Sequence, residues 1–70
     1  MVSELIKTAR EKLDIFQDKL AIAISVANVT ISFWETGKST PPRSTCERLS
    51  NYCEKMGIDK ELVEAIREIL

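Results

Sequence analysis

The stretch from Gln17 to Lys38 constrains the fold of this chain more than any other part. Its middle, Ala21 to Trp34, contains no charged residue, although charged residues make up 30% of the sequence. Its apolar residues have the spacing of two short helices that meet at an angle. They are Leu20, Ala21 and Ile24 in the first helix, and Ile31 and Trp34 in the second. Because only a short turn separates them, the stretch predicts a tight helix-turn-helix over about residues 17–35, followed by a helix stop at Gly37.

Three further helices are expected outside this stretch. Amphipathic spacing and helix-breaking residues predict them over about residues 3–13, 44–56 and 59–70, with Ser3 and Asp59 as N-caps. Two adjacent prolines in the run KSTPPRST predict a loop before the fourth helix. The sequence therefore predicts an all-α fold of five helices in a single domain over residues 1–70.

Residues that share one register carry a resemblance to a known family. They are Leu13, Ile15, Gln17, Leu20, Ala21, Val26, Ile31, Ser32, Trp34, Glu35, Gly37, Lys38 and Pro42. In these residues the chain resembles the helix-turn-helix domain of the lambdoid phage repressor and Cro class, also called the xenobiotic-response-element class, from about Leu5 to Ile58. The resemblance implies a five-helix, lambda-repressor-like DNA-binding domain. It also implies that the third helix, about residues 27–36, is the recognition helix.

The face of that third helix expected to read bases follows from the helical period. With Ile31 and Trp34 buried, a step of about 100° per residue turns four side chains outward together. These are Asn28, Val29, Ser32 and Phe33. Asparagine can pair with adenine, serine can meet several base edges or a phosphate, and valine or phenylalanine can touch a thymine methyl group.

The resemblance also implies contacts to phosphates and one ion pair. Gln17, with the N–H groups that open the second helix, would anchor one phosphate, and Lys38 and Arg43 would anchor others. The alternative for these two loop cations is that they only keep the chain in solution. Arg10 is expected to pair with Glu35, the alternative being a solvated arginine.

Several positions depart from the family pattern. Asp14 stands where glycine is usual, and Phe16 and Ala27 stand where a capping serine or threonine is common. None of the four outward residues of the third helix is basic, although relatives often have Arg, Lys or Gln there. Together with Phe16, the outward Val29 and Phe33 would form an uncharged apolar patch, which is typical of a protein-binding surface.

The predicted C-terminal helix has a broad apolar face. Its members are Leu62, Val63, Ile66, Ile69 and Leu70. Because this face is wider than packing on one small domain requires, part of it is expected to contact a second copy in a homodimer. Packing within the domain's own core is the alternative.

Charge and hydropathy limit the classes of partner. Ten Lys and Arg against eleven Asp and Glu give a net charge of −1, so the total charge supplies no strong attraction for nucleic acid or an anionic membrane. No apolar run approaches the roughly 20 residues that span a bilayer. The chain begins with a charged amphipathic segment instead of a signal sequence, so we expect a cytoplasmic protein with no membrane contact.

The sequence offers no catalytic or metal-binding constellation. Cys46 and Cys53 lie about 10 Å apart along one predicted helix, too far for a disulfide, so we expect two free and at least partly buried thiols. The chain has no histidine and no Gly-rich phosphate loop. We therefore expect no enzyme activity, no metal and no cofactor.

Two functions remain as hypotheses. The first is a small sequence-specific transcriptional regulator, a repressor that binds a pseudo-palindromic operator in double-stranded DNA as a homodimer. The second is an antirepressor-like protein-binding module that uses the apolar face of the recognition helix to contact a protein partner.

Overall fold

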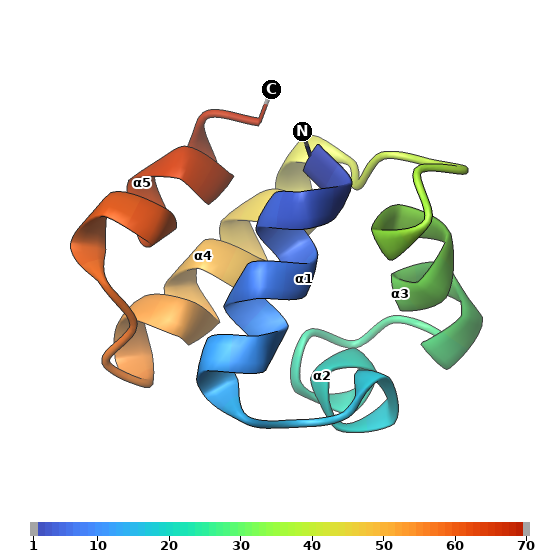
Figure 1. Cartoon of the computed structure of the whole chain (residues 1–70), viewed down its shortest axis with the longest axis horizontal. Coiled ribbons are helices and arrows are strands. Elements are labelled where there is room, and N and C mark those ends of the chain that lie inside the picture. Colours follow the sequence, from blue (N-terminus) through green and yellow to red (C-terminus); the bar gives the residue numbers. More distant parts are fainter. Residues whose placement is uncertain (1, 70) are drawn as a thin grey trace.

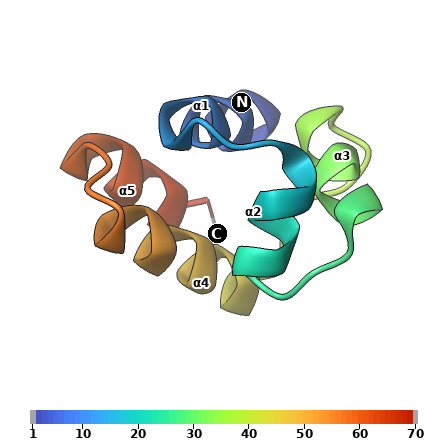
Figure 2. The same cartoon turned by 90° about the horizontal axis from the view of Figure 1, so that it is seen from below.

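The computed structural model describes residues 2–69, which form five helices and no strand. They are α1 (Val2–Leu13), α2 (Gln17–Ala23), α3 (Asn28–Glu35), α4 (Arg43–Lys55) and α5 (Lys60–Arg67). Helix α1 runs through the middle of the molecule, with α3 on one side and α5 on the other (Figure 1). In the view turned by 90°, α1 and α4 lie at opposite edges of the molecule (Figure 2). The predicted all-α, five-helix fold is confirmed.

Each helix contributes two buried residues to the core, and Ile24, directly after α2, adds one more. Its buried members are Ile6, Ala9, Leu20, Ala21, Ile24, Ile31, Trp34, Leu49, Cys53, Val63 and Ile66. Trp34 is only 2% exposed, as its spacing from Ile31 predicted. In a chain this small, a buried indole contributes a large share of the apolar area that folding removes from water.

Four of the helices end in the same backbone motif. The N–H groups of Ile15, Val26, Lys38 and Ile58 each bond to a carbonyl five residues earlier, with the preceding residue in the left-handed region. That residue is glycine at two ends, Gly37 and Gly57, and Asp14 (φ 58°) and Ser25 (φ 60°) at the others. The last two carry a Cβ in this conformation, which costs about 1 kcal/mol or more each.

The helix starts differ from those the sequence predicts. Helix α1 already includes Val2, so Ser3 lies inside it and is not its cap. Phe16 and Ala27 supply no side-chain cap, as expected, but Asp59 supplies none either. The Asp59 carboxylate instead accepts a bond of 3.1 Å from the Nζ of Lys12. Each of these starts depends on tertiary packing more than on a local cap.

The apolar face of α5 belongs mainly to the chain's own core. Val63 and Ile66 are buried against α1 and α4, so the prediction that these two residues face a second copy is wrong. Leu62 and Ile69 are half-buried and pack against the same core. Leu70 lies outside the described residues. The width of the face reflects contact with two helices of the same chain.

The two cysteines are free and buried, as predicted. Burial raises the pKa of the Cys53 thiol to about 11 and also raises that of Cys46. Both thiols are therefore neutral at physiological pH and serve as small apolar side chains of α4. Among residues 2–69, no helix has the length and apolar composition that crossing a bilayer requires.

The substitution Ile66→Asp tests whether this face is core or interface. It places an unpaired carboxylate among buried side chains, and we expect the variant to be largely unfolded at 25 °C by circular dichroism at 222 nm. The control is Leu62→Asp, at a half-buried position, which should lose less stability. A folded Ile66→Asp variant whose only defect is loss of an oligomer in sedimentation would contradict the assignment to the core.

Candidate nucleic-acid interface

Helix α3 has one anchored face and one open face. Ile31 and Trp34 fix it to the core, and the opposite side leaves Asn28, Val29 and Phe33 exposed. Val29 is 55% exposed and Phe33 is 41% exposed, which are high values for large apolar side chains. Ser32, the fourth residue predicted to point outward, is half-buried. The predicted outward face is therefore present, but its serine is less exposed than the other three residues.

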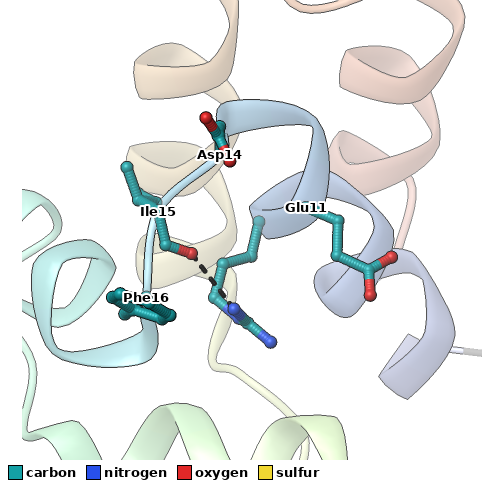
Figure 3. Close-up of a pocket in the computed structure, with 5 residues that line it drawn as sticks. Glu11, Asp14, Ile15 and Phe16 are labelled. Atoms are coloured by element: carbon teal, nitrogen blue, oxygen red, sulfur yellow. Dashed lines mark hydrogen bonds between the residues drawn. The ribbon is translucent and has the colours of Figure 1, made fainter.

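An ion pair joins the end of α3 to α1, as the family resemblance implied. Arg10 Nε donates to Glu35 Oε2 at 2.6 Å, and Arg10 Nη2 donates to Glu35 Oε1 at 3.0 Å. Gln17 Nε2, at the start of α2, donates to the same Oε1 at 3.1 Å. Arg10 Nη1 donates to the carbonyl oxygen of Ile15 at 3.1 Å, a bond drawn dashed in Figure 3. These four bonds fix α2 and α3 in position relative to α1.

The electrostatics of the pair follow from its partial burial. The Glu35 side chain is 6% exposed, and this burial raises its pKa. The hydrogen bonds from Arg10 and Gln17 outweigh burial, so the pKa of Glu35 ends below its ordinary value. The bond to Glu35 likewise raises the pKa of Arg10. Both groups are charged at neutral pH, and the positive charge of Arg10 is neutralised by Glu35 within the protein.

The start of α2 is less prepared for a phosphate than the sequence predicts. Gln17 uses one amide hydrogen on Glu35, which leaves it one hydrogen to donate. The carboxylate of Asp18 accepts a bond of 2.9 Å from the backbone N–H of Lys19. An acidic group therefore already occupies one of the N–H donors at this end of the helix. Its negative charge opposes a phosphate there.

Phe16 lies beside the predicted base-reading face. It is 82% exposed and borders a shallow depression together with Arg10, Gln17, Asp18 and Asn28. It also borders a second depression with Glu11, Asp14 and Ile15, where Figure 3 shows it. The sequence analysis placed Phe16 in an apolar patch but not among the DNA contacts. The sequence did contain a signal for a role of Phe16 at this surface, because an aromatic side chain at a capping position cannot cap the helix.

Of the two predicted loop cations, Lys38 contacts α3 directly and Arg43 opens α4. The backbone N–H of Lys38 bonds to the carbonyl of Phe33 at 2.8 Å. Its Nζ lies 5.9 Å from the centroid of the Phe33 ring, within the range of a cation–π contact. Arg43 is the exposed first residue of α4, and no carboxylate of residues 2–69 forms an ion pair with it.

Comparison with protein families shows that the chain belongs to the helix-turn-helix family of the Cro/C1 type. Residues 6–60 match the family, a range that contains α2, α3, α4 and most of α1. The chain is therefore a DNA-binding transcriptional regulator, from a family that is generally not enzymatic. Searches of the curated proteins and of the solved structures found no match.

The Arg10–Glu35 pair predicts a specific dependence of stability on pH. Because the pKa of Glu35 is lowered by folding, its contribution is present above the unfolded value of about 4.3 and is lost as pH falls through the folded value. Glu35→Gln should be less stable than the unmodified protein at pH 7 by roughly 1.5–3 kcal/mol. The difference between the two proteins should begin to shrink below about pH 4.3 and should keep shrinking as pH falls to 3, in urea unfolding followed at pH 3 to 7.

The control is Glu68→Gln, at an exposed carboxylate near the end of α5. It should lie close to the unmodified protein at every pH. A constant difference between Glu35→Gln and the unmodified protein from pH 7 to pH 3 would show that the charge of Glu35 does not stabilise the fold.

Proposed function

We propose that this protein is a sequence-specific repressor that inserts α3 into the major groove of double-stranded DNA. One observation carries the proposal: Asn28, Val29 and Phe33 are exposed on the side of α3 opposite to Ile31 and Trp34. The major groove is about 12 Å wide and accepts a helix with its side chains. In this orientation the exposed residues, with the hydroxyl of Ser32, contact the edges of the bases.

Phosphate contacts in this proposal come from both ends of the same face. Lys38, held beside Phe33, and Arg43, at the start of α4, reach the backbone on one side. On the other side Gln17 donates its remaining amide hydrogen. Such contacts position a protein on DNA without specifying sequence.

Repression in this proposal is by occupancy of a pseudo-palindromic operator. Helix α3 is short, with eight residues, and reads few base pairs on its own. Two copies on half-sites about one helical turn apart would multiply that specificity. Because Val63 and Ile66 are buried in each copy, such a pair must meet through another surface or through the DNA alone.

A second candidate function is supported by the apolar character of the same region. Phe16, Val29 and Phe33 are all exposed there, and large exposed apolar side chains are typical of contacts with proteins. An antirepressor-like module would use Phe33 as its anchor. Its binding would vary little with salt, because few ions are released when two apolar surfaces meet.

The salt dependence of DNA binding separates the two functions. Mobility shifts with the DNA that flanks the gene should show binding that weakens steeply between about 50 and 200 mM salt. Lys38→Ala or Arg43→Ala should each lower the slope by about one unit, and Asn28→Ala should cost about 1–3 kcal/mol at one base pair. The control is Lys60→Ala on α5, which lies on the side of α1 opposite to α3 (Figure 1).

A different result would favour the second function. It is the absence of DNA binding at low salt, together with a salt-insensitive protein complex from the host lysate that is lost on Phe33→Ala. That combination would overturn the proposed repressor.

Asp18 provides a test in the direction of tighter binding. Asp18→Asn removes a negative charge from the DNA side but keeps the oxygen that accepts the bond from the Lys19 N–H. Affinity for DNA at 50 mM salt should rise by about 3- to 10-fold, the size of one close charge contact in water. The matched control is Glu61→Gln in the first turn of α5. Equal effects from both variants would mean that only net charge matters.

A further inference from the structure

The major groove presents a different chemistry at each base pair. Guanine offers two acceptors that arginine or lysine reads best, cytosine offers an amino group that a carboxylate reads, and adenine suits the amide of asparagine. Thymine adds the C5-methyl group, the apolar feature of the major-groove edges. The side chains on a recognition helix therefore indicate which bases it can read.

The exposed face of α3 lacks the arginine, lysine or free carboxylate that reads guanine or cytosine best. Its residues are Asn28, Val29 and Phe33, with the half-buried Ser32 between them. The carboxylate within α3 is that of Glu35, which is nearly buried and bonded to Arg10 and Gln17. No cation lies in the helix itself, which leaves the Asn28 amide as the strongest direct reader of a base edge, and its partner is adenine.

Two large apolar side chains form the rest of this face. Val29 and Phe33 are four residues apart and so lie on one side of the helix, one turn from each other. The Lys38 ammonium lies over the Phe33 ring, 5.9 Å from its centroid, and so adds one cation beside these apolar side chains. Water contact with these side chains is unfavourable, and burying a methyl group against them is favourable.

We propose that this face selects DNA through the C5-methyl group of pyrimidines. Val29 and Phe33 receive these methyl groups while Asn28 pairs with an adenine, so each half-site is rich in A·T pairs. Because 5-methylcytosine carries the same methyl group at the same place, it can replace thymine against Val29 or Phe33. This inference rests on the proposed function and names the chemistry that the same site recognises.

The test starts from the duplex that the intact protein selects from a random pool. Each thymine is replaced singly by deoxyuridine, which removes the methyl group and keeps the pairing. Affinity measured at fixed salt should fall about fourfold at one or two positions in each half-site, the effect of one buried methyl group. Replacing such a thymine–adenine pair by cytosine–guanine should weaken binding, and 5-methylcytosine at that position should recover at least part of the loss.

Protein variants assign each methyl group to a side chain. Phe33→Ala or Val29→Ala should bind the thymine and deoxyuridine duplexes equally at one position, whereas Phe33→Leu should keep the difference. The control Ser32→Ala leaves both apolar side chains in place and should keep the difference at every position.

The outcomes distinguish this inference from the proposed function. Specific binding that is unchanged by deoxyuridine at every position, or selection of a G·C-rich half-site, would overturn the methyl inference and leave the repressor in place. Failure of the pool to yield any preferred sequence would overturn the proposed function, and the inference with it.

Discussion

The arrangement of this molecule depends on the partly buried ion pair between Arg10 and Glu35. The two residues are 25 positions apart in sequence, and their pairing brings the end of α3 against α1. Removing a carboxylate and a guanidinium from water is costly, and the cost is offset here because Gln17 and the Ile15 carbonyl complete the hydrogen bonding. The turn before α2, the start of α2 and the end of α3 thus share one polar centre, which sets the direction in which the open face of α3 points.

The same centre shapes the electrostatics of that face. Arg10 is neutralised within the pair, and Asp18 adds a negative charge at the start of α2. Lys38 lies beside Phe33 and Arg43 opens α4, so neither cation lies within α3. In our proposal, the attraction to phosphates therefore comes from a few local cations and not from the total charge, which is −1.

Sequence reasoning succeeded where the information was local. The spacing of Ile31 and Trp34 predicted the buried side of α3, and Gly37 predicted its end. The Arg10–Glu35 pair came from the family resemblance, since no local pattern relates residues so distant. The apolar face of α5 was misread because its width does not reveal whether Val63 and Ile66 contact their own chain or a second copy. Asp59, expected as a cap, bonds to Lys12, a partner 47 residues away that only the tertiary fold could supply.

The central claim, that the open face of α3 contacts DNA while the Arg10–Glu35 centre stays intact, can be tested by an NMR titration of the labelled protein with its selected duplex. Our account predicts the largest shift changes in residues 28–33 and 38–43 and in the side-chain amide of Gln17. It also predicts that the Arg10 Nε–H signal remains protected and that α5 changes little. Changes concentrated on α4 and α5, with the α3 signals unmoved, would contradict it.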